Sequence, residues 1–142
     1  MKKIQELLDQ KGDRVWSIGP DATVYEALTL MAEHRIGALL VTDSTGLIGL
    51  ISERDYAREG ILRGRSSKET AVRDIMTHRV VCATPEQSLE EAMILMTEKR
   101  VRHLPVIDGG QVLGLVSIGD LVKSIISEQK FIIEQLEHYI SQ

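Results

Sequence analysis

Apolar residues recur along the chain in two patterns, one with the spacing of a helix and one typical of a strand. In the first half, Thr23 begins a predicted helix and Glu26, three residues later, completes a capping box. The apolar positions of this helix form one stripe, made of Val24, Ala27, Leu28 and Met31. An apolar strand over 38–42, a polar turn at 43–46 and a second strand over 47–52 follow. The pattern predicts a helix followed by a β-hairpin.

The same pattern occurs a second time, 65 residues later. Ser88 and Glu91 form the second capping box, and residues 103–107 and 112–117 form the second hairpin. The second apolar stripe consists of Leu89, Ala92, Met93 and Met96. When Pro20–Asp55 is aligned with Pro85–Asp120, twelve of the 36 positions are identical. This internal duplication predicts two half-domains that pack about a pseudo-twofold axis.

Each copy is completed by a short strand before it and a helix after it. The strand candidates are residues 14–18 and 80–83, and the helix candidates are residues 55–63 and 120–127. Each half is therefore expected to run β-α-β-β-α, which gives an α+β fold. A three-stranded sheet with both helices on one face leaves its other face open, and pairing of the two halves would bury that face.

The segments outside the duplication are also helical in pattern. Residues 3–11 predict a short helix that Gly12 ends, and residues 129–140 carry an apolar stripe of Ile132, Ile133, Leu136 and Ile140. That C-terminal segment is either an extension of the last helix or a separate one, and its stripe predicts a homodimer face or packing on its own module. The expected domains are an N-terminal helix, two repeats and a C-terminal helix, at 1–13, 14–65, 66–127 and 128–142.

Composition narrows the function classes. The chain has 142 residues and a net charge of −4, which argues against nucleic acid or an anionic membrane as the main partner. Cys82 is the single cysteine, so an internal disulfide is excluded, and a small buried side chain is expected there. Neither a membrane-spanning apolar run nor a signal-peptide core occurs, which predicts a cytoplasmic protein.

Candidate chemistry lies where each hairpin passes into the next helix. Ser52 and Asp55, and again Ser117 and Asp120, form an S-x-x-D motif at equivalent strand ends. Backbone N–H groups and the positive end of a helix dipole suit a phosphate there, and an aspartate can accept hydrogen bonds from both hydroxyls of a ribose. The alternative interpretation is a plain helix N-cap with an acidic residue in the first turn.

These features together resemble the cystathionine-β-synthase (CBS) domain pair, also called a Bateman module. The resemblance rests on the strand endings GLISERD and GLVSIGD, on the sequence DIMT at 74–77 and on EKRVRHLPVID at 98–108. It covers residues 14–127, and the whole chain looks like stand-alone bacterial proteins made of one such pair. The resemblance implies binding of AMP, ATP, NAD or S-adenosylmethionine, dimerisation, and regulation rather than catalysis.

The resemblance also implies two clefts, each combining the S-x-x-D motif of one repeat with the first strand and the helix-to-strand passage of the other. The first expected site consists of Ser52, Asp55, Met76, Thr77, Val80, Val81, Val101, Arg102 and His103. The second expected site consists of Ser117, Asp120, Val15, Trp16, Ser17, Ile36, Gly37 and Ala38. Guanidinium and imidazole groups favour phosphate, so Arg102 and His103 make the first site the better phosphate site, with Arg54 as an additional candidate.

The resulting hypothesis is a regulatory module that senses an adenine nucleotide, with AMP as the first candidate and ATP, ADP, NAD(H) or S-adenosylmethionine as alternatives. Strand backbone groups would select adenine, the aspartates would hold ribose, and an unknown protein would be regulated. The alternative is a structural dimerisation scaffold with empty clefts. An enzyme is disfavoured, since no catalytic trio or P-loop is present, and His34, His78, His138 and Cys82 share no metal-binding spacing.

Overall fold

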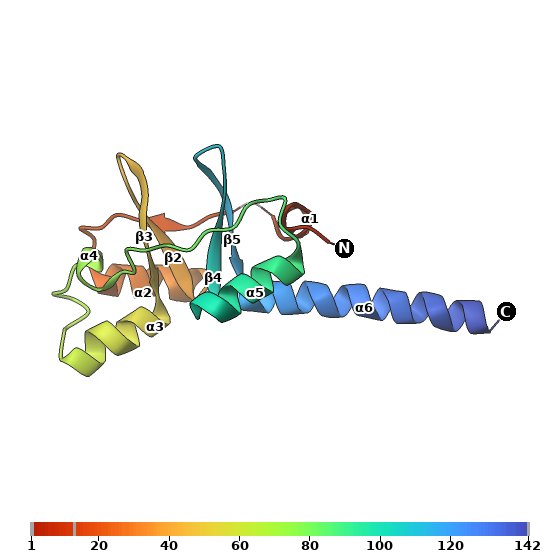
Figure 1. Cartoon of the computed structure of the whole chain (residues 1–142). Coiled ribbons are helices and arrows are strands. Elements are labelled where there is room, and N and C mark those ends of the chain that lie inside the picture. The colour runs from red at the N-terminus through yellow and green to blue at the C-terminus, as the bar shows by residue number, and fades with distance from the viewer. Residues whose placement is uncertain (1, 13, 142) are drawn as a thin grey trace. The chain divides into compact units, whose positions relative to one another are not determined.

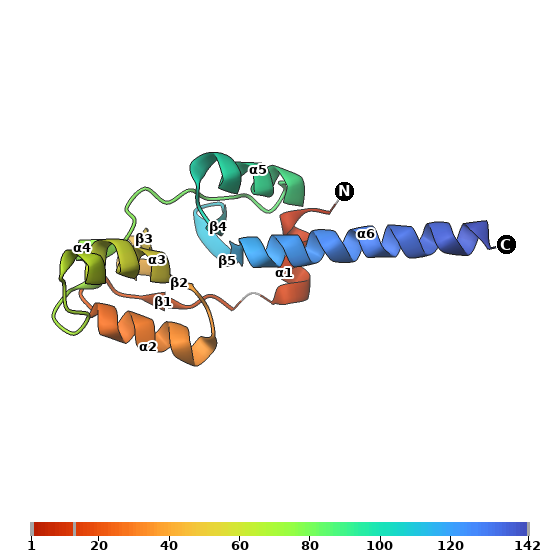
Figure 2. The same cartoon turned by 90° about the horizontal axis from the view of Figure 1, so that it is seen from below.

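The computed structural model describes residues 2–12 and 14–141, and its contacts divide the chain into two units (Figures 1 and 2). The first-repeat unit consists of residues 14–80. The second-repeat unit combines the N-terminal residues 2–12 with residues 81–141. One repeat of the duplication therefore lies in each unit, and each unit has an aliphatic core of its own.

The first-repeat unit is built on a three-stranded sheet with the order β1-β2-β3. The strands β1 and β2 are parallel, and β2 and β3 form an antiparallel hairpin in which Ala38 pairs with Ser52. The elements are β1 (Ser17–Ile18), α2 (Val24–His34), β2 (Ala38–Asp43), β3 (Gly46–Ser52), α3 (Glu53–Asp55), a π-helix (Tyr56–Gly60), a 3₁₀-helix (Ile61–Arg63) and α4 (Val72–Ile75). The predicted capping box and apolar stripe of α2 are confirmed, since Val24, Ala27 and Met31 are buried and Leu28 is partly buried.

The second-repeat unit has a two-stranded sheet, β4-β5, packed with three helices. Its elements are α1 (Ile4–Lys11), α5 (Leu89–Lys99), β4 (His103–Asp108), β5 (Gln111–Ser117) and α6 (Ile118–Ile140). The capping box of α5 is present, and Leu89, Ala92 and Met96 are buried as the stripe predicts. The duplication extends to the backbone, because Arg35 and Arg100 both end their helices in the left-handed conformation.

The predicted strand over 80–83 is wrong. Only Ala83 pairs there, in a parallel bridge with Val106, which is the counterpart of the Ile18–Val41 pair in the first repeat. In the first repeat the N–H of Leu40 also donates to the carbonyl of Trp16 at 3.2 Å. The residue equivalent to Leu40 is Pro105, which has no N–H to donate, so the second repeat loses this ladder bond.

Two further predictions need correction. The strand expected over 14–18 is confined to Ser17–Ile18, and the helix expected over 55–63 is three short helical segments of different pitch. The π-helix in the middle brings the ring of Tyr56 against Gly60, where an added Cβ would lie 2.8 Å from a ring carbon. The wider turn and the absence of a side chain at Gly60 together make room for this ring.

The N-terminal helix α1 belongs to the core of the second repeat. The N–H of Ile4 donates to the carbonyl of Gln87 at 2.9 Å, and Ile4, Leu7 and Leu8 are buried. In the first-repeat unit α4 and the residues after it hold a comparable place, because Thr77 exchanges two backbone hydrogen bonds with Leu50. In both units a short segment from outside the repeat therefore closes over the hairpin.

The two hairpins contain equivalent glycines, Gly49 and Gly114, that meet these closing segments. An added Cβ at Gly49 would lie 2.7 Å from the sulfur of Met76 and 2.9 Å from the carbonyl oxygen of Thr77. At Gly114 it would lie 2.7 Å from one terminal methyl carbon of Leu8. The backbone carbonyl of Thr77 cannot move away from an added Cβ, whereas the methyl group of Leu8 can. Gly114 should therefore tolerate replacement by alanine better than Gly49 does.

We therefore expect Gly49→Ala to lower the free energy of unfolding by about 1–3 kcal/mol, as overpacking does. Gly114→Ala is expected to lower it by less than about 1 kcal/mol, because the strain is relieved by Leu8 and the unfolded chain becomes less flexible. Urea unfolding of both variants measures the difference. Equal losses in the two variants would contradict the assignment.

The final helix, α6, is one continuous helix of 23 residues. This resolves the alternative left by the sequence, because residues 129–140 extend the last helix of the repeat. Leu121 and Ser124 are buried near its start, whereas large apolar side chains from Phe131 onward are exposed. Within the described residues, no helix is both long and apolar enough to cross a membrane.

Candidate ligand-binding site

The first S-x-x-D motif lies at the junction of β3 and α3. The Ser52 hydroxyl accepts a hydrogen bond from the Asp55 N–H at 3.1 Å. The Asp55 Oδ2 accepts from the Ser52 N–H at 2.9 Å and from the Ser52 hydroxyl at 3.0 Å. The motif is therefore a complete capping box, as the plain N-cap interpretation requires.

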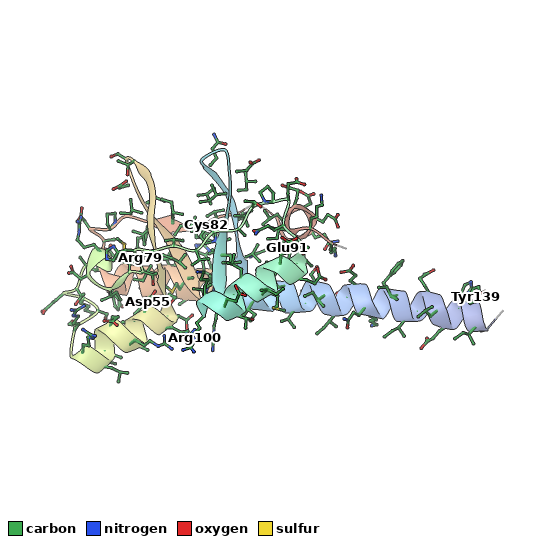
Figure 3. All side chains as sticks on the ribbon, viewed as in Figure 1. Asp55, Arg79, Cys82, Glu91, Arg100 and Tyr139 are labelled. Carbon is green, nitrogen blue, oxygen red and sulfur yellow. The ribbon has the colours of Figure 1, made fainter. Side chains whose placement is uncertain are left out.

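The other carboxylate oxygen of Asp55 has a different partner. Asp55 Oδ1 accepts a hydrogen bond from the hydroxyl of Thr77, at 3.2 Å, across 22 residues of sequence. Asp55 and Thr77 are both half-buried, and Figure 3 labels Asp55 at the start of the short helix. The structure thus brings together three predicted members of the first site, Ser52, Asp55 and Thr77, inside one unit.

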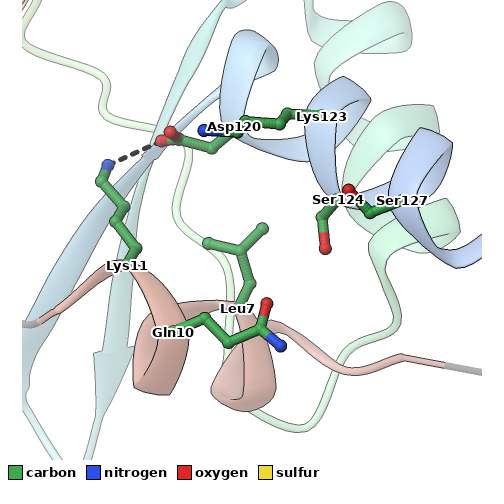
Figure 4. Close-up of a pocket in the computed structure, with 7 residues that line it drawn as sticks. All are labelled: Leu7, Gln10, Lys11, Asp120, Lys123, Ser124 and Ser127. Carbon is green, nitrogen blue, oxygen red and sulfur yellow. Dashed lines mark hydrogen bonds and ion pairs between the residues drawn. The ribbon is translucent and has the colours of Figure 1, made fainter.

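The second S-x-x-D motif has the same cap and a charged partner. The Ser117 N–H donates to Asp120 Oδ2 at 2.9 Å, and the Asp120 N–H donates to the Ser117 hydroxyl at 3.1 Å. The ammonium group of Lys11 donates a hydrogen bond to Asp120 Oδ2 at 2.6 Å (Figure 4). It also donates to the carbonyl oxygen of Leu115 at 2.6 Å. The two motifs therefore differ in electrostatics, because Asp55 accepts from neutral groups where Asp120 accepts from a cation.

The pKa of Asp120 reflects this environment. Burial is the largest single influence and pushes this pKa upward, but the hydrogen bond from Lys11, the N–H of Ser117 and the charge of Lys11 together hold it below its usual range. A carboxylate with a lowered pKa in the folded state stabilises the fold above its unfolded pKa, and this stabilisation is lost as the pH falls through the folded pKa.

Lys11→Met is accordingly expected to lower the melting temperature at pH 7, where the ion pair is fully formed. The difference from the wild type should shrink as the pH falls below about 4, because Asp120 then becomes protonated in both proteins. Thermal unfolding from pH 7 to pH 3 measures this difference. Lys3→Met is the control, since its pair with Glu86 is exposed on both sides and contributes little. A pH-independent difference for Lys11→Met would contradict the role of the pair.

The remaining predicted residues are distributed between the two units. Met76 is buried in the core of the first-repeat unit, Val80 is half-buried at its end, and Arg54 is half-buried beside Asp55. Val81 and Val101 pack against the core of the second-repeat unit. In that unit the carbonyl of Arg102 accepts the N–H of Ile118 at 2.9 Å, and His103 pairs with Ser117.

The first repeat contributes several residues to the second expected site. These residues lie beside the Ser52–Asp55 motif or on the sheet of the first-repeat unit. The carbonyl of Gly37 accepts the N–H of Glu53 at 3.1 Å, and Ala38 pairs with Ser52. Val15, Ser17 and Ile36 lie on the same unit, and the ring of Trp16 stacks on His34 with centroids 3.5 Å apart. Both expected sites draw residues from both units, so their composition stays a prediction.

Sequence reasoning missed Lys11, which precedes its partner by 109 residues. No spacing rule connects the two positions, and only the packing of α1 in the second-repeat unit places the ammonium group at Asp120. Cys82 is half-buried, and this burial raises the pKa of its thiol. Across residues 2–12 and 14–141, no group of three or more histidine, cysteine or acidic side chains is placed to hold a metal ion.

Comparison with known proteins identifies the fold. The family model of the CBS domain matches residues 12–61 and 72–127, so the chain belongs to the CBS-domain family and contains two repeats of it. It is 43% identical over 134 residues to the mitochondrial CBS domain-containing protein CBSX3 of Arabidopsis thaliana, covering 91% of this chain and 65% of the length of that relative.

Solved structures agree with this assignment. A CBS-domain protein from Burkholderia ambifaria superposes with a TM-score of 0.87 at 49% identity, covering 90% of this chain and 96% of that one. A hexameric CBS-CP12 protein from bloom-forming cyanobacteria gives a TM-score of 0.78 at 29% identity, covering 86% of this chain and 70% of that one. CBS domain pairs are generally regulatory modules that bind adenosine-containing ligands, are not catalytic, and often oligomerise.

Proposed function

We propose that this chain is a regulatory module that binds an adenine nucleotide, with AMP as the first candidate, at a site centred on Asp55. The observation that carries the proposal is the position of the Asp55 carboxylate. One carboxylate oxygen accepts hydrogen bonds from the N–H and the hydroxyl of Ser52, and the other accepts from the hydroxyl of Thr77. All three donors are neutral. A carboxylate fixed in this way is oriented to accept from the vicinal hydroxyls of a ribose.

The two aspartates are not equally available to a sugar. A ribose hydroxyl that binds Asp120 must compete with the ammonium group of Lys11, which is a charge-assisted donor, whereas at Asp55 it competes with the hydroxyl of Thr77. This difference supports the ranking in which the first site binds nucleotide more strongly. Arg102 and His103 remain the proposed phosphate ligands, and Arg54 remains a further candidate.

A binding panel tests the proposal. AMP, ADP, ATP, NAD, NADH and S-adenosylmethionine are each titrated by calorimetry and screened by thermal shift, because a ligand that binds only the folded state raises the melting temperature. We expect a saturable signal with at least one of these compounds and no turnover of it. Well-folded protein that binds none of them would favour the structural scaffold instead.

The exposed face of α6 supports a homodimer as the signalling unit. Residues Ile118, Val122, Ile125, Gln129, Ile132, Leu136 and Tyr139 recur at alternating steps of four and three, which is the spacing of a coiled-coil seam. Ile125 is half-buried against the core of its own unit and Gln129 is polar, so the exposed apolar positions of this seam are Ile118, Val122, Ile132, Leu136 and Tyr139. Ile126, Ile133 and Ile140 widen this seam, and all three are more than half exposed. An apolar stripe of this length is complementary to a second copy of itself, and nucleotide binding would act on a partner protein through the dimer.

A further inference from the structure

A pocket of about 470 Å³ lies between α1 and the first turns of α6 in the second-repeat unit. Its size is within the range of pockets that bind small molecules. Leu7 of α1 lies among polar side chains from both helices (Figure 4). Those polar side chains are Gln10, Lys11, Asp120, Lys123, Ser124 and Ser127.

Ser124 gives this pocket an unsatisfied polar group. The side chain is more than nine-tenths buried, and its hydroxyl has no hydrogen-bond partner among the described residues. Figure 4 shows this hydroxyl directed into the space between α6 and α1. A buried hydroxyl without a partner costs free energy, so a ligand that supplies a hydrogen bond at this point gains from it.

The charges around the pocket favour an anion. Lys11 and Lys123 contribute two positive charges, and Asp120 contributes one negative charge that Lys11 already engages. Lys123 therefore provides the excess charge, and its side chain extends along the rim toward Asp120 (Figure 4).

The remaining polar groups favour a ligand with hydroxyls as well as an anionic group. Ser124 and Ser127 come from neighbouring turns of α6, and the amide of Gln10 comes from α1. Hydroxyl and amide groups both donate and accept, which suits the alcohol groups of a small metabolite. Leu7 offers an apolar contact for the carbon skeleton.

We propose that this pocket binds a small organic phosphate that also carries hydroxyl groups, with the phosphate held by Lys123 and Ser124 and the hydroxyl groups held by Ser127 and Gln10. The pocket includes Asp120 of the second predicted nucleotide site but lies entirely within the second-repeat unit. The pocket contains none of the residues Ser52, Asp55 and Thr77. Ligand binding in it is therefore independent of the nucleotide site proposed at Asp55.

The test is an NMR titration of the full chain with glycerol 3-phosphate and with inorganic phosphate, following the amide signals of residues 123–127. We expect saturable shifts with both, and tighter binding of glycerol 3-phosphate. Lys123→Ala and Ser124→Ala should each weaken glycerol 3-phosphate binding about tenfold. Lys130→Ala is the matched control, seven residues further along α6 and outside the pocket, and should bind like the wild type.

Ser124→Ala removes an unsatisfied buried hydroxyl, so the fold of this variant should be retained with an unchanged or higher melting temperature. Asp55→Ala should bind glycerol 3-phosphate like the wild type, which separates this pocket from the nucleotide site. Absence of saturable shifts, or equal binding by the wild type and Lys123→Ala, would overturn the proposal. Equal affinity for glycerol 3-phosphate and inorganic phosphate would contradict the proposed contacts of the ligand hydroxyls with Ser127 and Gln10.

Discussion

Replacing Asp55 with alanine is expected to weaken adenine nucleotide binding by about ten- to a hundredfold, as measured by calorimetry with whichever nucleotide the panel identifies. A hydrogen bond to a charged group contributes roughly 1.5–3 kcal/mol, and Asp55 would make such bonds to the ribose. The variant also loses one half of its capping box, so its melting temperature is measured alongside.

Glu53→Ala is the matched control for this experiment. It removes the same charge from the same short helix, but its exposed side chain takes no part in the cap or in the contact with Thr77. We expect Glu53→Ala to bind nucleotide within about twofold of the wild type. If Asp55→Ala binds normally and Asp120→Ala does not, the ranking of the two sites is wrong.

The second large effect concerns α6. The double variant Ile132→Glu, Leu136→Glu is expected to convert the proposed homodimer into a monomer, because two carboxylates would have to be buried without partners in the seam. Both side chains are at least half exposed within one chain, so the fold of the monomer should be retained. Sedimentation velocity at micromolar concentration measures the change.

Lys130→Glu, Glu134→Lys is the control for the dimer experiment. These residues lie on the same helix but outside the seam, and the exchange leaves the net charge unchanged. We expect this variant to sediment like the wild type. A dimer that survives the two glutamates in the seam would place the interface elsewhere.

Local signals in the sequence were sufficient for most elements of the fold. The capping boxes at Thr23 and Ser88 begin helices as predicted, and both hairpins form around their polar turns. These features depend on residues only a few positions apart, where hydrogen bonding and apolar spacing determine the backbone. The duplication reinforced each of them, because every signal was available twice.

The failures concern positions where the two copies are no longer equivalent. Pro105 stands where the first repeat has Leu40, and one missing N–H reduces a strand to a single bridge at Ala83. Lys11 lies outside the duplicated region and contacts Asp120 through the packing of α1. A repeat-based prediction assumes that equivalent aspartates have equivalent surroundings, and this assumption fails at Asp55 and Asp120.

The packing of α1 with the second repeat has a consequence for biosynthesis. The first-repeat unit is continuous in sequence, whereas the second-repeat unit joins residues 2–12 to residues 81–141. The apolar side chains of Ile4, Leu7 and Leu8 are synthesised before Leu104, Val116 and Leu121, which complete the core that buries them. At a synthesis rate of about 5–20 residues per second, that interval is on the order of ten seconds. The helix α1 is therefore made well before the residues that bury its apolar face.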